Sequence, residues 1–268
     1  MRLYDRDYSS LTPDEQSEWR SVKAKETVSK VGDLAITVNL FRDYPKAARH
    51  FTSLFPNNYL DIVELKDENR LHKYVKRFQQ VLESPQVNER KILNFINKNQ
   101  AYFIVGSLLK DRYSFGHHDA YLFPEFRLGN SHVVDYLLVG KSSDGWSFLF
   151  VEFESPNENI TLRNGELGAS FRKGLAQVSE WDQWLDGHFS SLTETFARLK
   201  SQSESLPQEF VTLNKTRIYY LVVAGRRTDF LERTYRERRK KLRDNAELLL
   251  HYDNVVDAAE KIIGRETY

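Results

Sequence analysis

Along the chain, hydrophobic and polar residues follow the two-residue period of strands in some segments and the period of helices in others. A helix-breaking pair of residues divides the chain into two parts. In the first part, residues 33–41 are rich in β-branched and apolar side chains and residues 59–65 alternate in polarity, which predicts two strands. Residues 68–82 carry apolar side chains three and four positions apart, which predicts a helix. The Ser-Pro pair at 84–85 breaks that helix, so we expect a small α+β module over residues 1–84.

The second part, residues 85–268, predicts an α/β domain with a mixed β-sheet core flanked by helices. A helix is expected from Asn88, whereas the apolar run at 101–110 leaves helix and strand equally open. The expected elements then follow in order: strands at 122–128, 133–139 and 146–153, a helix at 167–184, a strand at 216–224, a basic helix, and a closing helix at 255–263. This order of elements excludes a helical bundle or a β-sandwich.

Composition limits the class of protein further. The chain has 268 residues, 40% of them hydrophobic, with no cysteine, and its mean hydropathy is −0.58. It is long enough for a substantial core, and no stretch approaches the roughly 18 to 20 apolar residues that cross a bilayer. The lack of cysteine excludes thiolate zinc sites and thiol nucleophiles. Because the N-terminal residues also lack the apolar core of a signal peptide, we expect a cytoplasmic protein that does not enter a membrane.

Positive charge is concentrated in one segment of an otherwise balanced chain. Lys and Arg number 39 against 38 Asp and Glu, yet the run from Arg226 to Arg243 holds nine basic and three acidic residues. Such a run is compatible with a solvated helix face and equally with contacts to nucleic-acid phosphates. On the second interpretation, the phosphate contacts come from Arg226, Arg227, Arg236, Arg239 and Lys240.

Candidate chemistry lies on the predicted hairpin of strands 133–139 and 146–153. If its turn centres on Asp144 and Gly145, then Asp135 lies opposite Glu154, and if residues 142–145 form the loop, it lies opposite Glu152. Both registers put all three acids on one face of the sheet, because side chains alternate along a strand and cross-strand partners share a face.

Three carboxylates on one face repel one another unless a cation or protons neutralise them. Oxygen-only ligands suit Mg²⁺ or Mn²⁺ better than zinc or copper. The alternative is an amphipathic hairpin whose acids face solvent, but Asp135 has apolar neighbours on both sides, and so does Glu152. We therefore favour a metal site that includes these two acids.

Helix residues could complete such a site. Glu89 shares a face with apolar residues three, four and seven positions later, or it is an ordinary first-turn acid that complements the helix dipole. Glu125 is a further candidate acid. Lys173 and Gln177 are four residues apart and so share a helix face. Lys173, or alternatively Arg172, could stabilise charge that develops on a phosphate, but from its residue type alone Lys173 is more often a solvated surface lysine.

These residues lie within five ordered phrases that resemble a known family. The phrases are those around Asn88–Gln100, Arg127–Leu138, Phe150–Pro156, Gly174–Leu185 and Leu221–Asp257. Together they resemble the restriction-endonuclease-like core of the PD-(D/E)XK nuclease superfamily, and within it the Shedu (SduA-type) anti-phage defence proteins. The resemblance covers about residues 85 to 265, and residues 1–84 match nothing.

The resemblance implies roles for single residues. Asp135 and Glu152 would be the Mg²⁺ ligands, Glu89 the helix acid and Gln177 the helper on the following helix. Glu154 or Glu89 would be a further ligand or an acid just outside the metal's ligands. The chain departs from the superfamily at Glu154, where a catalytic lysine normally stands. We expect Lys173 to supply that positive charge from the helix instead.

The expected function is therefore a Mg²⁺- or Mn²⁺-dependent DNA endonuclease of bacterial anti-phage defence, acting on DNA that is expected to be double-stranded. The alternative is a catalytically degenerate nuclease-fold module that binds nucleic acid or a partner protein. The resemblance also implies a homo-oligomer, and it makes residues 1–84 a candidate regulatory module that senses a phage-derived trigger.

Overall fold

A five-stranded mixed sheet forms the centre of the computed structural model, which describes residues 2–31, 34–38, 40–158 and 160–268. The strand order is β3-β4-β5-β6-β7. The first three strands form an antiparallel meander, and β6 and β7 add to it in parallel. The strand bounds are β3 Asp119–Leu128, β4 His132–Ser142, β5 Gly145–Phe153, β6 Ile218–Val223 and β7 Glu247–Leu250. The predicted α/β class with a mixed sheet is confirmed.

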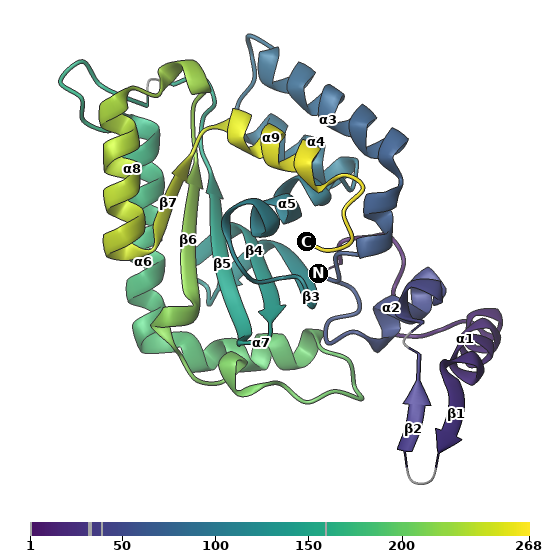
Figure 1. The fold of residues 1–268 in the computed structure, drawn as a ribbon. Coiled ribbons are helices and arrows are strands. Elements are labelled where there is room, and N and C mark those ends of the chain that lie inside the picture. Colours follow the sequence, from purple (N-terminus) through teal and green to yellow (C-terminus); the bar gives the residue numbers. More distant parts are fainter. Residues whose placement is uncertain (1, 32–33, 39, 159) are drawn as a thin grey trace.

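Helices cover both faces of this sheet (Figure 1). One face packs in a hydrophobic cluster with α3 (Glu68–Glu83), α4 (Glu89–Lys98), α5 (Phe103–Arg112) and α9 (Tyr252–Ile262). The other face packs against α6 (Ala169–His188) and α7 (Leu192–Leu199) in a second cluster rich in aromatic side chains. The basic helix α8 (Glu232–Asn245) lies against the edge strand β7. The apolar run left open at 101–110 is thus helical, while β7 and α7 were not predicted.

The β4–β5 hairpin has a defined register. Its closing pair is Ser142 with Gly145, so the loop consists of the two residues between them, and Gly145 has a φ of +103° that favours glycine. The ladder continues to Tyr136 opposite Val151. Continued by one residue, this register puts Asp135 opposite Glu152, which is the second of the two registers considered above.

The N-terminal segment contains α1 (Pro13–Glu26), the strands β1 (Thr27–Val31) and β2 (Leu34–Thr37), and α2 (Lys46–Thr52). In Figure 1, α1 and the β1–β2 pair project from the rest of the molecule, and α1 buries none of its residues. The strand predicted at 33–41 is shorter in the structure, because Phe41 already begins a 3-10 turn. Asp33 and Asn39 of that prediction lie outside the described residues.

The strand predicted at 59–65 is wrong. Tyr59 makes only an isolated bridge to Tyr121 of β3, and a 3-10 helix follows from Ile62 to Lys66. Asp61 explains the difference, since its carboxylate accepts a hydrogen bond from the backbone N–H of Val63 and so caps the helical turn. The alternating pattern identified a buried segment but not its conformation.

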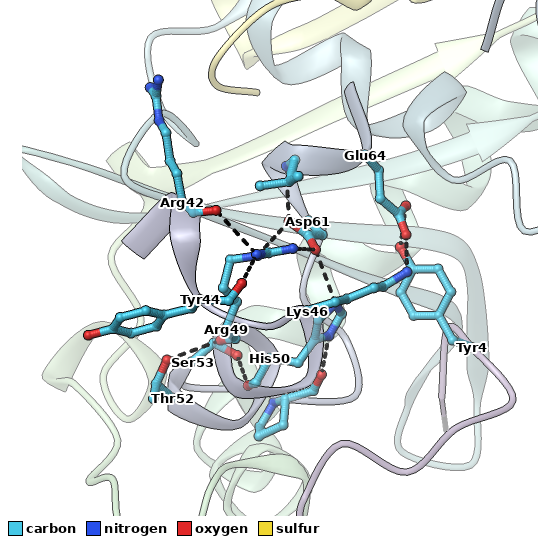
Figure 2. Close-up of polar contacts among 12 residues, drawn as sticks. Tyr4, Arg42, Tyr44, Lys46, Arg49, His50, Thr52, Ser53, Asp61 and Glu64 are labelled. Carbon is cyan, nitrogen blue, oxygen red and sulfur yellow. Dashed lines mark hydrogen bonds and ion pairs between the residues drawn. The ribbon is translucent and has the colours of Figure 1, made fainter. Parts of the chain in front are cut away.

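Asp61 also belongs to a buried polar cluster that ties α2 to this segment (Figure 2). The Arg49 guanidinium donates two hydrogen bonds to the Asp61 carboxylate, at 3.2 and 2.9 Å, and another to the carbonyl of Tyr44. The His50 ring stacks on Tyr8 at a centroid distance of 4.0 Å. Burial lowers the pKa of His50 to about 4, so the ring is neutral at pH 7. Because the Arg49–Asp61 ion pair is buried and hydrogen-bonded, it holds α2 and this segment in one relative position.

Helix α3 shares its hydrophobic core with the second part of the chain. Its buried residues Leu71, Val75, Phe78 and Leu82 belong to the same cluster as α4, α9 and one face of the sheet. The buried ring of Tyr268 belongs to this cluster too and lies against Gly106. The boundary predicted after residue 84 stays a prediction, but the core continues across it. In the described part of the chain, no helix is long and apolar enough to cross a membrane.

We predict that Phe78→Ala lowers the free energy of unfolding by about 3–5 kcal/mol, because it opens a cavity where the ring is fully buried. Calorimetry should show one unfolding transition that moves to lower temperature as a whole. Gln79→Ala, an exposed neighbour on the same helix, is the control and should leave the transition in place. Two transitions, of which Phe78→Ala moves only one, would instead mean that residues 1–84 fold separately.

Candidate active site

Three acids lie at the end of β5 or beside it on β4, and two of them, Glu152 and Glu154, contact α6. On β5, Phe148 and Phe150 point into the cluster formed with α6, and Glu152 continues this alternation. On β4, Leu137 and Val139 point into the same cluster, but so does Val134, so the alternation is interrupted next to Asp135 and does not by itself assign that acid to a face. Glu154 follows the end of β5. The packing of β5 thus places Glu152 on the face that α6 covers, while the convergence of all three acids on one face stays a prediction.

Gly174 allows α6 to approach the strands closely at this point. A Cβ on Gly174 would lie 2.5 Å from Cγ1 of Val222 and 3.3 Å from Cγ of Glu154, so a side chain would push the helix away. The neighbouring Lys173 and Gln177 therefore reach the glutamates of β5.

Lys173 joins two of the acids. Its Nζ donates a hydrogen bond of 2.8 Å to Oε2 of Glu154 and lies 3.8 Å from Oε2 of Glu89, the first residue of α4. Glu154 is 3% exposed as a residue, whereas the Lys173 side chain is 61% exposed and so reaches the site from solvent. The site thus lies where α4, α6 and β5 meet.

Glu152 and Asp135 have different partners. Nε2 of Gln177 donates a hydrogen bond of 2.6 Å to Oε1 of Glu152, which is 4% exposed. Oδ2 of Asp135 accepts a hydrogen bond of 2.7 Å from the backbone N–H of Phe153. These contacts orient the two side chains that the resemblance assigns to metal binding.

Burial makes the charged form of these acids costly. Burial and the neighbouring charges of Asp135 and Glu154 raise the pKa of Glu152 well above its usual range, despite the hydrogen bond from Gln177. Burial likewise raises the pKa of Asp135, with smaller contributions from Glu89 and Glu154. Burial alone would lower the pKa of Lys173, but its hydrogen bond and ion pair with Glu154 outweigh this and raise it. Lys173 therefore stays positively charged and offsets the negative charge of the neighbouring carboxylates.

The donor set fits a divalent cation of the magnesium type. Oε2 of Glu152 and Oε1 of Glu154 are buried without a hydrogen-bond partner, and buried carboxylate oxygens of this kind are expensive unless a cation or proton meets them. As they stand, no three Asp, Glu or His side chains in the described residues are grouped closely enough to surround an ion. Mg²⁺ is commonly bound by only one or two carboxylates, with water and substrate phosphate in the other positions.

Tyr252 supports the site, although sequence reasoning gave it no role. The buried Tyr252 hydroxyl donates a hydrogen bond of 2.7 Å to the backbone carbonyl of Glu154, whose own N–H donates to the carbonyl of Val223. These two bonds hold the backbone of Glu154 after β5 ends. The only sequence signal was an aromatic residue within the phrase around residues 250–257 that carried the resemblance.

Glu125 lies beside the site in a strained backbone conformation. The β3–β4 register passes from Pro124 opposite Tyr136 to Phe126 opposite Val134, which leaves Glu125 facing Asp135. Its φ is +47°, a left-handed value that is uncommon for residues other than glycine. The other alternative residue, Arg172, lines a separate groove with Arg233 and Arg236.

The predicted phosphate-contacting residues fall into two groups. Arg226 makes a bidentate ion pair with Asp253 and also donates to the carbonyl of Leu82, while Arg227 pairs with Asp257. Their donors therefore hold α9 and α3 in place. The other three are exposed on α8; Arg239 pairs with Glu232, and both partners are largely solvated. The group on α8 that faces solvent comprises Arg236, Arg239 and Lys240.

The fold and this site define a mixed α/β protein with a buried cluster of carboxylates, one lysine and one glutamine at the end of its central strand. Residues 86–256, which is more than half of the chain, match the family described as Shedu protein SduA, C-terminal. The chain belongs to this family. No curated protein matches it. Membership of the Shedu family suggests a role in anti-phage defence.

We predict that Glu152→Gln stabilises the metal-free protein at pH 8 by about 1–2 kcal/mol. The pKa of Glu152 is raised in the folded state, so its contribution to stability is fully present below the unfolded pKa of about 4.3 and is lost as the pH rises towards the folded pKa. Thermal unfolding in EDTA between pH 5 and about 8 should therefore show a flatter profile for the variant.

The matched control for this pH profile is Glu204→Gln, which changes an exposed glutamate and should reproduce the wild-type curve. If Glu152→Gln also parallels the wild type, the buried charge has no cost and the assignment of Glu152 as a desolvated acid fails.

We predict opposite effects of two substitutions at Glu125. Glu125→Gly should leave the free energy of unfolding unchanged or slightly higher, because glycine adopts a φ of +47° without a steric cost. Glu125→Val should lower it by about 1–2 kcal/mol, since a β-branched side chain is poorly tolerated there. Chemical denaturation measures both, and equal effects of the two variants would contradict backbone strain.

Proposed function

We propose that this protein is a Mg²⁺- or Mn²⁺-dependent DNA endonuclease that acts in bacterial anti-phage defence. The observation that carries the proposal is the pair of buried glutamates, Glu152 and Glu154, each with an oxygen that has no hydrogen-bond partner. Nζ of Lys173 lies 2.8 Å from the other oxygen of Glu154, and Asp135 of the neighbouring strand is hydrogen-bonded to the backbone of Phe153. Membership of the Shedu family supports the biological part of the proposal. The restriction-endonuclease-like relationship of the fold is likewise proposed, on the meander β3–β4–β5 followed by the parallel β6.

In the proposed site, Asp135 and Glu152 would hold the metal ion. When bound, the ion would activate a water molecule for attack on the phosphodiester and neutralise charge on the phosphate. Gln177 orients Glu152 by donating to Oε1, which leaves Oε2 free as a ligand. The hydrogen bond from Phe153 fixes Oδ2 of Asp135 in the same way.

Lys173 takes the role that the superfamily assigns to the lysine at the position of Glu154. Its ammonium group lies between Glu154 and Glu89, so it is held at the site by two carboxylates although most of the side chain is exposed. A phosphate oxygen that gains negative charge during cleavage would be stabilised by this cation. Glu154 and Glu89 act as positioning residues that keep Lys173 beside the metal ligands.

Substrate binding in the proposal is electrostatic. The chain is close to neutral overall, so contacts to double-stranded DNA must come from local cations, among them Arg236, Arg239 and Lys240 on α8. A cytoplasmic location, assembly into a homo-oligomer and control by a phage-derived trigger acting on residues 1–84 belong to the same proposal.

The second candidate function is a catalytically degenerate module that binds nucleic acid or a partner protein. The feature in its favour is Glu154, a carboxylate in the position of the usual lysine. The ion pair of Lys173 with this glutamate argues for the nuclease instead, because the missing positive charge is supplied from α6.

The experiment is cleavage of linear and circular DNA with Mg²⁺ or Mn²⁺ by the wild type and by Asp135→Asn, Glu152→Gln and Lys173→Met. Each substitution should reduce the cleavage rate about 100-fold or more, because it removes a metal ligand or the stabilising cation. Lys25→Met, on the projecting helix α1, is the control for loss of an exposed lysine and should retain activity.

Two results would overturn the proposal in different ways. Absence of metal-dependent cleavage by the wild type, with DNA binding intact, would favour the degenerate binding module. Cleavage that is lost in Asp135→Asn and Glu152→Gln but retained in Lys173→Met would leave the nuclease in place and refute the role of Lys173.

A further inference from the structure

An open groove of about 550 Å³ runs between α3 and α4, outside the carboxylate site. Helix α3 contributes Arg77 and Gln80 to its walls, Ser84 follows at the end of that helix, and α4 contributes the set Lys91, Asn94 and Lys98. In both sets the residues are spaced by three and then four positions, so each set forms one continuous face. The two faces flank the groove with groups that donate hydrogen bonds.

The groove is positively charged. Three of its lining residues are cations, and no acidic residue is among those described along it. The Arg77 guanidinium lies over the rings of Phe95 and Tyr74, at 5.7 and 5.9 Å from their centroids. Stacking of this kind orders the guanidinium and leaves its N–H groups available at the edge. On a chain with a net charge of +1, such a groove attracts an anionic ligand.

The groove lies beside the first turn of α4 that carries Glu89, on the other side of that helix. Helix α4 begins at Glu89, which is 3.8 Å from Lys173, and Lys91 of the groove follows two residues later. The groove residues of α4 run from Lys91 to Lys98, which is a length of about 10 Å at a rise of 1.5 Å per residue. That length corresponds to about three base pairs of a nucleic-acid duplex.

A second groove lies on the α8 side of the same site. It has a volume of about 540 Å³. Three arginines line it, Arg172, Arg233 and Arg236, and so do two acidic residues, Glu166 and Glu237. Arg172 directly precedes Lys173 on α6. Figure 1 shows α8 and α3 on opposite sides of the sheet, so the carboxylate site has cationic surface towards both. An extended polyanion fits this arrangement, whereas a small anion would need only one enclosed pocket.

We propose that the groove between α3 and α4 binds the phosphate backbone of double-stranded DNA on one side of the cleavage site. This inference rests on the proposed nuclease function and adds to it a substrate-binding surface on which α3, from the predicted N-terminal module, contacts the substrate together with α4. Lys91 and Lys98 contact phosphates as point charges, and Arg77 can bind one in a bidentate manner.

The test is the salt dependence of DNA binding by the full chain in EDTA, which prevents metal-dependent cleavage. Fluorescence anisotropy with a labelled duplex of about 20 base pairs, roughly two helical turns, measures Kd over a range of salt concentrations. Lys91→Ala/Lys98→Ala should weaken binding about 10-fold at low salt and reduce the slope of log K against log salt by about 1.8, which is about 0.9 for each lost phosphate contact.

Two control variants separate a phosphate contact from a structural effect. Lys91→Arg/Lys98→Arg keeps both charges and should retain the wild-type slope. Arg20→Ala/Lys25→Ala removes two exposed cations from α1 and should bind as the wild type does. Thermal unfolding should be the same for all variants, since Lys91 and Lys98 are exposed.

The outcomes distinguish the inference from the function on which it rests. If the wild type binds and cleaves DNA but Lys91→Ala/Lys98→Ala shows an unchanged Kd and slope, the groove is not a DNA contact and only this inference fails. If the wild type binds no duplex DNA at any salt concentration, the inference and the proposed function fail together.

Discussion

The cost of burying carboxylates at the end of β5 is the constraint on which the arrangement around the site depends. Glu152 and Glu154 are almost inaccessible to solvent, and each has an oxygen without a hydrogen-bond partner. Buried acids of this kind must be met by protons or cations. Gln177 donates a hydrogen bond to Glu152, and Lys173 donates one to Glu154, so these two contacts offset part of the cost of burial. One oxygen of each glutamate is left for a proton or a cation to meet.

This constraint explains several features of the packing. Gly174 is needed because α6 must approach β5 and β6 closely enough for Lys173 and Gln177 to reach the glutamates. Tyr252 holds the carbonyl of Glu154 from the opposite helical layer, through α9. Glu89 approaches Lys173 from α4, which also belongs to that layer. Both layers therefore contribute to one site at the end of the sheet, and a change in either layer alters its geometry.

The basic residues of the chain fall into two groups, those that hold helices in place and those that face solvent. Arg226 and Arg227 pair with acids of α9 and serve the fold. Cations without a buried partner face solvent in two grooves, one between α3 and α4 and one between α6 and α8. A nearly neutral chain thereby presents local positive surface beside an acidic site.

The sequence by itself determined the elements with strong periodicity. It also singled out Lys173 and Gln177, which the structure joins to Glu154 and Glu152 by hydrogen bonds. The helix α3 and the strands β4, β5 and β6 follow from local pattern, and the alternation of β5 requires Glu152 to share a face with Phe150. Tertiary structure decided what local pattern leaves open. The segment at 59–65 is a helical turn because Asp61 caps it, β7 is a strand because β6 pairs with it, and α5 is a helix in an apolar run compatible with both conformations. The meeting of Lys173 with Glu154 and Glu89 also depends on three elements far apart in the sequence, which only the packing of both layers brings together.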